Sequence, residues 1–564
     1  MAQTRLTQSY VHQSCIRPFK NITVGRLLDS AANNFPNREA LVFMEDGTRK
    51  TFANLHHDVN RISAGLLQLN LKPGDPVAIL ADENYRFISA EMAAATAGFT
   101  SVRILRLVSL DGLKDTLNRV GCKALIVGIT YMNQIEVLKN IMSSLETSTS
   151  HNLSISELPN LKHIISLLAD ECPGVINIKE LEVLGDNEAA RLLLKKVKSE
   201  TDMDDFHTIV FTSGSTGSPK AVSLTHARHN DYVLFMKNAF DITIDTVKTQ
   251  RLIFAHQDIL VSGSFTFSEG AMLTLGATIV ISYPPNNTSS LLKAIHQEQC
   301  NIGLLFPEVI YDIANHMNID EYNISCFRYP ILIGSLFSEQ LTKKVSLVTS
   351  WELYQLYSSV ECGSITYQSH RVPMKERMST AGYTAMYGEL KIVNESNRIN
   401  AINKPGEICF RGPFLFIKYW GDPEKTREAK SECGWFHTGD VGIMDDKGCL
   451  KILGRKDDMI IKGGDNIYPT EIECLFVGHP KIRRLQVVPV PDERFFSEIC
   501  LCVILVDDVS STKDELIEHL KGKIHSFKYP RYVLFMKEFP MTKTSKIKRK
   551  ELAIQAAEIL NLNN

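Results

Sequence analysis

Residues 212–220 form a glycine- and hydroxyl-rich run, Thr-Ser-Gly-Ser-Thr-Gly-Ser-Pro-Lys, whose composition is compatible with few local structures. The run directly follows residues 207–211, an apolar stretch with the length and composition of a buried strand. Glycines let the backbone turn and approach a ligand closely, hydroxyl and amide groups donate to phosphate oxygens, and a lysine adds positive charge. We therefore expect a phosphate-binding loop formed by Thr212, Ser213, Gly214, Ser215, Thr216, Gly217 and Lys220.

Two other interpretations of this run are weaker. A flexible Gly/Ser linker has a similar composition, but linkers rarely follow a buried strand and end in Pro-Lys. A Walker P-loop needs glycine, four residues and then Gly-Lys-Ser/Thr, whereas Ser218 and Pro219 separate Gly217 from Lys220 here. The run therefore predicts a phosphate loop of another kind.

The pattern around the loop favours an α/β fold. Strand-like segments at residues 77–80, 123–128 and 207–211 alternate with helix-like segments at residues 90–97 and 113–120. At 564 residues the chain is too long for one core, so we expect several domains or subdomains. Further short strands are predicted at residues 277–281 and 302–306, strands of a smaller β-rich subdomain at residues 406–410 and 450–452, and a polar surface insertion at residues 143–159.

A polar break at residues 454–458, Gly-Arg-Lys-Asp-Asp, predicts a joint between domains. The chain beyond it reads as a compact α+β unit, with helices at residues 470–476 and 513–524 and strands at residues 485–490 and 499–506. We therefore divide the chain into an N-terminal domain at residues 1–453, a hinge at residues 454–458 and a C-terminal domain at residues 459–564.

Charge and composition exclude several classes of partner. A net charge of −2 gives no general attraction to nucleic acid, and no apolar run is long enough for a transmembrane segment. The twelve cysteines show no CxxC pair, which is typical of a reducing compartment, so we expect a cytoplasmic protein. Four basic residues without an acidic one at residues 1–28 leave the mitochondrial matrix as the alternative.

Three further motifs lie far from the loop in the sequence. Tyr357 and Glu361 are an aromatic residue and a carboxylate four positions apart. Asp440 ends the run Trp-Phe-His-Thr-Gly-Asp, and Lys546 lies in a basic stretch near the end of the chain. Alone, each has a simpler interpretation: packing and surface for the first pair, a turn for Thr-Gly-Asp and a solvated face for the basic stretch.

Taken together with the loop, these motifs resemble the acyl-adenylate-forming superfamily, which includes acyl-CoA synthetases, peptide-synthetase adenylation domains and beetle luciferases. The resemblance runs over nearly the whole chain and is strongest to the medium-chain acyl-CoA synthetase branch. It implies an α/β fold with a large two-subdomain N-terminal adenylation domain that includes a small β-rich subdomain, and a small mobile α+β C-terminal domain. It implies no oligomeric state.

The resemblance also implies an activity. ATP would activate a medium-chain fatty acid, or a long-chain one, to acyl-AMP with release of pyrophosphate. Transfer to CoA would then give acyl-CoA and AMP. The implied partners are small molecules only, namely the carboxylic acid, ATP and CoA as co-substrate, with Mg²⁺ as the metal.

Residue roles follow from the same resemblance. Lys546, Lys220 and Glu361 correspond to catalytic positions, and Glu361 also to the magnesium ligand. Tyr357 would stack on adenine, and Asp440 would accept hydrogen bonds from the ribose hydroxyls.

The resemblance assigns the joint and the segment after it as well. Arg455 would reach the ribose or phosphate, Asp457 would be the hinge pivot, and Gly463 and Gly464 would line the tunnel for the pantetheine arm of CoA. For this segment, a glycine turn followed by a capping box of Thr470 and Glu473 is the structural alternative.

Several positions depart from the family pattern. Ala221 and Ser545 replace glycines beside the two lysines, which would strain any backbone that needs a positive φ. Ser358 and Val360 replace the glycine and threonine of the Tyr-Gly-x-Thr-Glu motif, so one hydroxyl is lost.

Two segments depart as well. Residues 254–268 lack a clear aromatic-His motif, because His256 lies out of register, and residues 101–109 lack the usual Asn-Pro. These departures leave two alternatives open: a catalytically weakened homologue that binds nucleotide or acyl ligand, and an adenylating enzyme with a non-CoA acceptor.

Overall fold

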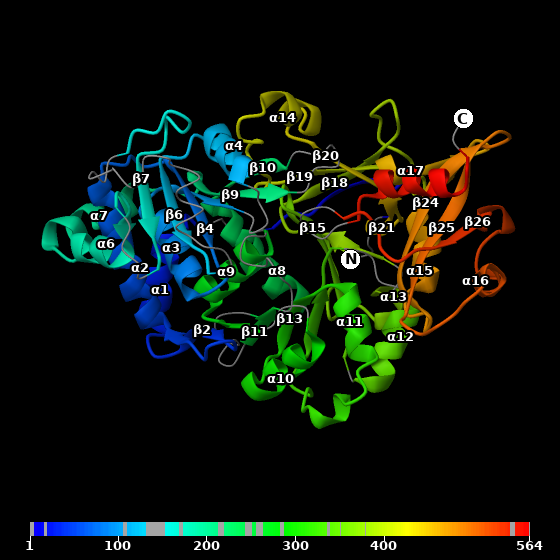
Figure 1. The fold of residues 1–564 in the computed structure, drawn as a ribbon, viewed down its shortest axis with the longest axis horizontal. Helices are drawn as coiled ribbons and strands as arrows, with labels where there is room; N and C mark the ends of the chain where they lie inside the picture. The colour runs from blue at the N-terminus through cyan, green and yellow to red at the C-terminus, as the bar shows by residue number, and fades with distance from the viewer. Residues whose placement is uncertain are drawn as a thin grey trace.

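The computed structural model shows a large N-terminal domain and a small C-terminal domain (Figure 1). It describes residues 5–15, 20–104, 110–130, 153–168, 173–212, 219–242, 251–254, 263–282, 287–334, 339–349, 351–377, 380–541 and 547–562. The chain is a mixed α/β protein, as the sequence predicts. Of the predicted insertion, residues 143–152 lie outside the described residues.

A seven-stranded sheet forms the first half of the N-terminal domain. Neighbouring strands are parallel, except that β10 at one edge pairs antiparallel with β9. The central strands are continuous apolar runs, as strands covered on both faces require. In sheet order the strands are β10 (Lys220–Thr225), β9 (Phe206–Thr212), β5 (Thr100–Arg103), β4 (Pro76–Ala81), β6 (Ala124–Gly128), β7 (His163–Ser166) and β8 (Ile176–Asn177).

A fourteen-stranded sheet forms the second half, and its character changes along its length. One part is parallel and alternates with helices: β15 (Tyr354–Ser359), β14 (Tyr329–Leu332), β13 (Ile302–Leu305), β11 (Arg251–Phe254), β12 (Thr278–Ile281) and β2 (Glu39–Phe43), with β3 (Arg49–Thr51) antiparallel at the edge. The other part is antiparallel: β1 (Tyr10–His12), β18 (Glu389–Val393), β19 (Gly406–Arg411), β20 (Phe436–Met444), β21 (Cys449–Arg455), β17 (Gly382–Thr384) and β16 (Gly363–Tyr367). The predicted β-rich subdomain is therefore confirmed as the antiparallel part.

Helices pack between and around these sheets. The largest apolar core joins residues of the helices α1, α2, α3, α8 and α9 to both sheets, and Figure 1 shows α8 and α9 in the middle of the molecule. The described helices of the N-terminal domain are α1 (Val24–Asn34), α2 (Phe52–Leu66), α3 (Tyr85–Thr96), α4 (Leu110–Val120), α6 (Ile178–Gly185), α7 (Glu188–Glu200), α8 (His229–Phe240), α9 (Gly263–Leu275), α10 (Thr288–Glu298), α11 (Pro307–Ala314), α12 (Glu339–Val348), α13 (Met374–Arg377) and α14 (Pro423–Ala429).

The C-terminal domain has its own sheet and core. It contains the hairpin β22 (Ile460–Lys462) and β23 (Asp465–Ile467), the sheet β24 (Ile482–Asp492), β25 (Phe496–Leu505) and β26 (Tyr532–Phe535), and helices α15 (Pro469–Phe476), α16 (Lys513–Leu520) and α17 (Arg549–Ile559). Each predicted helix and strand of this unit is present. The strand β25 ends one residue before the predicted residue 506. The helix α16 ends at Leu520 and not at the predicted residue 524, because Gly522 just beyond it adopts a left-handed φ of +74°.

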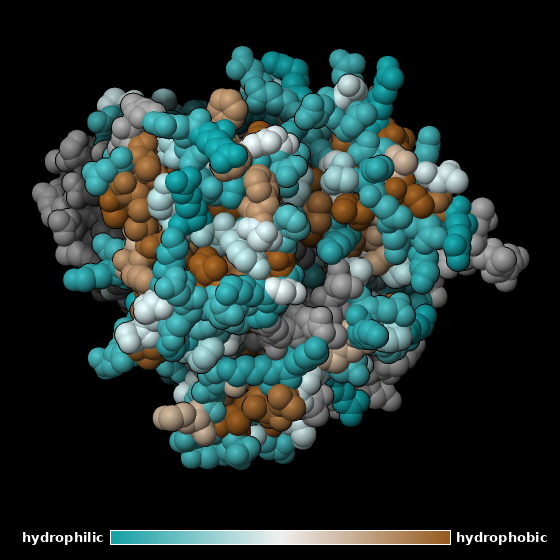
Figure 2. Space-filling view, turned by 90° about the vertical axis from the view of Figure 1, so that its right-hand side faces the viewer, coloured by the Kyte–Doolittle hydropathy of each residue, from teal (hydrophilic) through white to brown (hydrophobic). Residues whose placement is uncertain are grey.

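The face shown in Figure 2 is mostly hydrophilic, with hydrophobic residues in separate small groups. Among the described helices, none is long and apolar enough to cross a membrane. The described cysteines are all free thiols, and the side chains of Cys500 and Cys502 are both buried, as expected for residues two apart on a strand.

One feature of the core was not predicted from the sequence: a cluster of charged and imidazole side chains with no solvent exposure. Arg103 of β5 contacts Glu91 of α3 at 2.9 Å and Glu269 of α9 at 3.8 Å. The Nε2 atom of His207 lies 3.5 Å from Glu91 and 3.6 Å from Glu269. The cluster ties β5 and β9 of the seven-stranded sheet to the helices that cover it.

His229 completes this cluster. Its Nδ1 lies 3.0 Å from the carbonyl oxygen of His226 and its Nε2 lies 3.2 Å from Oε2 of Glu269. Because a carbonyl accepts only, Nδ1 carries a proton, and a second proton must lie between Nε2 and Glu269. Arg103 and that proton balance the two carboxylates. Although His207, His229 and Glu269 could together hold a metal ion, a divalent ion would leave this buried group with excess positive charge.

The fold depends on pH through His226, which is fully buried and accepts a hydrogen bond on Nδ1 from the backbone N–H of Val24. Burial, with the nearby charges of His229 and Arg26, lowers the pKa of His226 to about 3. The unfolded chain takes up a proton near pH 6.5 while the native protein does not, so this contribution to stability is lost as pH falls from 6.5 towards 3.

We predict that His226→Asn, whose Oδ1 can still accept from Val24, loses less stability in acid than the wild type. The difference in free energy of unfolding between the two proteins should change by about 2 kcal/mol between pH 7 and pH 5. Urea denaturation followed by circular dichroism at both pH values measures it. Parallel losses in the two proteins would contradict the prediction.

Candidate active site

The predicted phosphate loop lies at the open end of the β9–β10 hairpin. Thr212 and Lys220 are paired across the two strands, and both are partly buried. Ser213, Gly214, Ser215, Thr216 and Gly217 lie outside the described residues. The structure therefore fixes the two ends of the loop.

The free edge of β10 pairs with residues 417–420, which come from the other half of the domain. The backbone N–H of Trp420 donates to the carbonyl of Ala221 at 2.7 Å, and Ser223 exchanges two backbone bonds with Lys418 and Ile417 at 3.1 and 3.2 Å. This pairing places the ring of Tyr419 4.9 Å from the ammonium of Lys220. Ala221 is an ordinary buried strand residue, and its φ is not positive, so the strain expected from the missing glycine is absent at this position.

Tyr419 links Lys220 to Glu361. Its hydroxyl donates to Oε1 of Glu361 at 2.9 Å, and Glu361 lies in the turn between β15 and β16. Burial, with Glu361 close by, raises the pKa of Tyr419, so this hydroxyl keeps its proton at neutral pH. Lys220, Tyr419 and Glu361 thus form one row of contacts across the join between the two sheets. No sequence pattern singles out Tyr419.

A second group of contacts centres on Asp440. Tyr357 donates its hydroxyl to Oδ2 of Asp440 at 2.6 Å, and Arg455 donates to Oδ1 at 3.0 Å. Asp440 and Arg455 face each other on β20 and β21. Burial raises the pKa of Asp440, and the opposing charge of Arg455 favours its ionised form. Each carboxylate oxygen keeps a lone pair for another donor, so the group can still accept from a ligand hydroxyl.

The two groups adjoin. Tyr357 and Glu361 lie four residues apart on the same hairpin, and Arg455 is near enough to Tyr419 to act on the pKa of its hydroxyl. The structure therefore brings together five of the predicted residues, which are Lys220, Tyr357, Glu361, Asp440 and Arg455.

Residues 454 and 455 of the predicted hinge end β21, and residues 456–458 form a short 3-10 turn, η5 (Lys456–Asp458), between β21 and β22. Lys456 faces the N-terminal domain, 3.4 Å from Glu407. Asp458 faces the C-terminal domain, 3.4 Å from Nε of Arg549. Asp457 lies between them and is exposed. Among the described residues, the turn thus has one ion pair on each side.

Gly463 and Gly464 form the turn between β22 and β23, with φ of +57° and +92°. Both are left-handed conformations that favour glycine. A Cβ on Gly464 would meet no atom within 4 Å, which leaves open space beside this turn.

The capping-box interpretation of the next helix is wrong. Tyr468 is the N-cap of α15 and makes no side-chain cap bond, while the hydroxyl of Thr470 donates to the carbonyl of Leu453. Glu473 instead accepts from the backbone N–H of Val487 at 2.7 Å and pairs with Arg549 at 2.6 Å. Both side chains therefore bind partners elsewhere in the fold, and neither caps α15.

Lys546 lies outside the described residues, as do Ser545 and His256. The residues on either side of Lys546 are placed: Met541 pairs with Ile547, and the backbone N–H of Lys548 donates to the carbonyl of Pro540 at 2.8 Å. Arg549 then anchors the start of α17 to Glu473.

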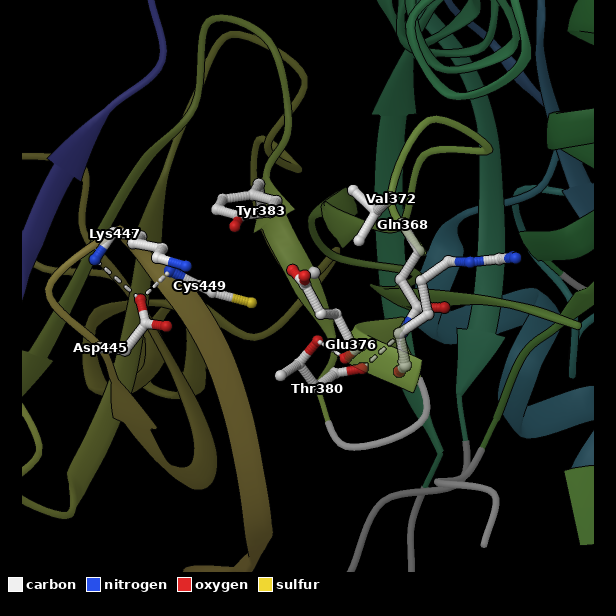
Figure 3. Close-up of a pocket in the computed structure, with 10 residues that line it drawn as sticks. Gln368, Val372, Glu376, Thr380, Tyr383, Asp445, Lys447 and Cys449 are labelled. Atoms are coloured by element: carbon white, nitrogen blue, oxygen red, sulfur yellow. Dashed lines mark hydrogen bonds between the residues drawn. The ribbon is translucent and has the colours of Figure 1, made fainter. Parts of the chain in front are cut away.

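A separate pocket of about 390 Å³ lies between β16, β17, α13 and the turn before β21 (Figure 3). Its polar side chains mostly hold local backbone: Gln368 donates to the carbonyls of Arg377 and Thr380, both at 2.5 Å, and Asp445 accepts from two turn amides. None of the residues that line it belongs to the two groups above.

Comparisons with known proteins agree along the chain. The family model described as AMP-binding enzyme matches residues 28–420, and the model of the AMP-binding enzyme C-terminal domain matches residues 471–546. The chain is 32% identical to the mitochondrial medium-chain acyl-CoA ligase ACSF2 of Bos taurus and 33% identical to that of Homo sapiens, covering in each case 98% of this chain and 91% of the relative.

Solved structures show the same fold. The anthranilate CoA ligase AuaEII in complex with anthranoyl-AMP superposes with a TM-score of 0.81 at 21% identity, over 97% of this chain and 99% of that one. ATP-bound MatB from Rhodopseudomonas palustris superposes with a TM-score of 0.76 at 18% identity, over 95% of this chain and 100% of that one.

We predict that Asp440→Asn weakens ATP binding by about tenfold or more, because an amide replaces the charged acceptor between Tyr357 and Arg455. Isothermal titration with ATP measures the affinity. Asp445→Asn is the matched control, since Asp445 caps the turn between the same two strands and should leave the affinity unchanged. Equal affinities of wild type and Asp440→Asn would contradict a role for Asp440 in the site.

Proposed function

The chain belongs to the AMP-binding enzyme family as an AMP-forming acyl-activating ligase, and we propose that it joins a medium-chain fatty acid to CoA, with a long-chain acid as the second choice. The identity to medium-chain acyl-CoA ligases over nearly the whole chain supports this substrate class. The observation that carries the proposal is the junction of the Lys220–Tyr419–Glu361 row with the Tyr357–Asp440–Arg455 group.

In this proposal ATP lies across the junction. Tyr357 stacks on adenine, Asp440 accepts from the ribose hydroxyls, and Arg455 supports the ribose or phosphate. Lys220 and the loop from Thr212 to Gly217 hold the phosphates. A carboxylate oxygen of the acid attacks the α-phosphorus, the bond to pyrophosphate breaks, and acyl-AMP forms.

Glu361 fits a magnesium site. It presents a partly buried carboxylate beside Lys220, with Tyr419 holding one oxygen, and a carboxylate is the hard oxygen ligand that Mg²⁺ prefers beside phosphates. When bound, the metal would neutralise phosphate charge. Tyr419 would keep the Glu361 side chain aimed at that position.

The C-terminal domain takes part in both half-reactions. We propose that Lys546 offsets the negative charge at the attacked phosphate, and that rotation about Asp457 then replaces it with the face carrying Gly463 and Gly464. The CoA thiolate would attack the acyl carbon there, and AMP would leave. Support comes from the short turn at Lys456–Asp458, where Lys456 pairs with Glu407 on one side and Asp458 pairs with Arg549 on the other. This arrangement favours domain limits at residues 453 and 459.

Two observations bear on the cellular compartment of the protein. The matched mammalian relatives are named mitochondrial. Residues 10–12, however, form β1 of the main sheet, so part of the basic stretch at residues 1–28 serves the fold. We propose the cytoplasm, with the matrix as the alternative that fractionation with a C-terminal tag would decide.

The proposal predicts pyrophosphate release with ATP, Mg²⁺ and fatty acids, with the highest kcat/KM for medium-length chains. A coupled pyrophosphate assay over acids of increasing length measures this preference, and addition of CoA should then consume the acyl-AMP. If folded protein releases no pyrophosphate with any acid of the panel, the result would favour a non-catalytic binding homologue. Acyl-AMP that persists in the presence of CoA would favour another acceptor.

We further predict that Lys546→Ala slows acyl-AMP formation by about a hundredfold or more, because it removes charge that acts in the first half-reaction. Transfer from supplied acyl-AMP to CoA should change little. Lys548→Ala, two residues away, is the matched control. An equal loss in both half-reactions would contradict the proposed role of Lys546.

A further inference from the structure

A buried arginine at the start of α8 holds the backbone of the turn that carries Glu361. Nη2 of Arg228 donates to the carbonyl of Val360 at 2.6 Å and to that of Glu361 at 3.1 Å. Arg228 is 4% exposed. Its guanidinium is thus committed to two carbonyls, one of which belongs to Glu361 itself.

Asp231, one helical turn further along α8, holds the other end of the same turn. Its Oδ2 accepts from the backbone N–H of Ser364 at 2.8 Å, and Asp231 is 3% exposed. Between these two anchors lies Gly363, with φ of +73°. A Cβ there would lie 2.1 Å from Nη1 of Arg228 and 2.4 Å from Oδ2 of Asp231, so the two side chains pack directly against the glycine.

Glu361 is therefore restrained on both sides. Its carbonyl accepts from Arg228 and also from the backbone N–H of Phe416 at 2.7 Å, while its carboxylate is held by Tyr419. The backbone bonds fix where the side chain begins, and the Tyr419 bond fixes where it ends. Together they leave the carboxylate little freedom beside Lys220.

Burial of these charges is costly for stability. Burial raises the pKa of Asp231 to about 6, although Arg228 and the Ser364 amide oppose the shift. Two buried charged groups usually add little net stability compared with apolar residues of the same size. Their retention beneath this turn is better explained by the geometry that they impose.

We propose that Arg228 and Asp231 are positioning residues that hold Glu361 in place to bind the metal of MgATP. This inference rests on the proposed function for its metal, and on the hydrogen bonds above for its geometry. Neither residue touches the substrate; both act through the backbone of the turn at residues 360–364.

Arg228→Met removes the donors and keeps most of the length, and Arg228→Lys keeps the charge. Arg377→Met is the matched control, because Arg377 is equally buried and donates to a carbonyl, that of Leu353, just before the start of β15. Hydrogen exchange of the peptide covering residues 357–366 reports the turn directly. The Mg²⁺ concentration for half-maximal pyrophosphate release reports the site.

We expect Arg228→Met to speed exchange in this peptide and to raise the half-maximal Mg²⁺ concentration by about tenfold, with partial recovery in Arg228→Lys. Arg377→Met should lower the Tm without moving the Mg²⁺ requirement. If Arg228→Met leaves exchange in the turn unchanged, or loses activity with an unchanged Mg²⁺ requirement, the inference is overturned. If the wild type releases no pyrophosphate, the proposed function fails, and the exchange comparison still decides whether Arg228 holds the turn.

Discussion

The site depends on the pairing of β10 with residues 417–420. These backbone hydrogen bonds join the edge of the seven-stranded sheet to a segment beside the antiparallel half of the larger sheet. Lys220 and Glu361 belong to different halves of the domain, and these bonds bring the two halves together at the site. The pairing brings Tyr419 between them, so a lysine at the end of one hairpin and a glutamate in the turn of another become neighbours.

The buried charged side chains of this protein serve the geometry of the fold and the site more than the stability of the fold. The cluster of Arg103, Glu91, Glu269 and His229 lies in the core beneath the phosphate hairpin, and Arg228 and Asp231 lie beneath the Glu361 turn. Each group is costly to bury, and among the described residues one oxygen of Glu91, one oxygen of Glu269 and Nε of Arg228 have no hydrogen-bond partner. The first group ties β5 to the covering helices α3 and α9, and the second holds the backbone of the turn that carries Glu361. The proposed hinge, by contrast, has within the described residues one partly exposed ion pair on each side, Lys456 with Glu407 and Asp458 with Arg549.

Much of the fold was predictable from local pattern. The apolar runs at residues 77–80 and 123–128 became central parallel strands, because strands covered on both faces are apolar throughout. The helix over residues 513–524 was predicted four residues too long, since apolar spacing continued past the glycine that ends it. The capping box at Thr470 and Glu473 failed for a different reason: partners from distant strands outcompeted a bond that sequence spacing alone would allow.

The candidate chemistry was predictable from local motifs: a glycine-rich loop after a strand, a Tyr–Glu pair, an aspartate after Thr-Gly and a terminal lysine. Which of these residues meet, and which residues support them, depends on the packing of distant elements. Tyr419, Arg228 and Asp231 have no motif, because their roles come from hydrogen bonds to residues about 60 to 130 positions away. Such contacts depend on how two sheets and a helix pack together, and a linear pattern of residue types carries no record of that packing.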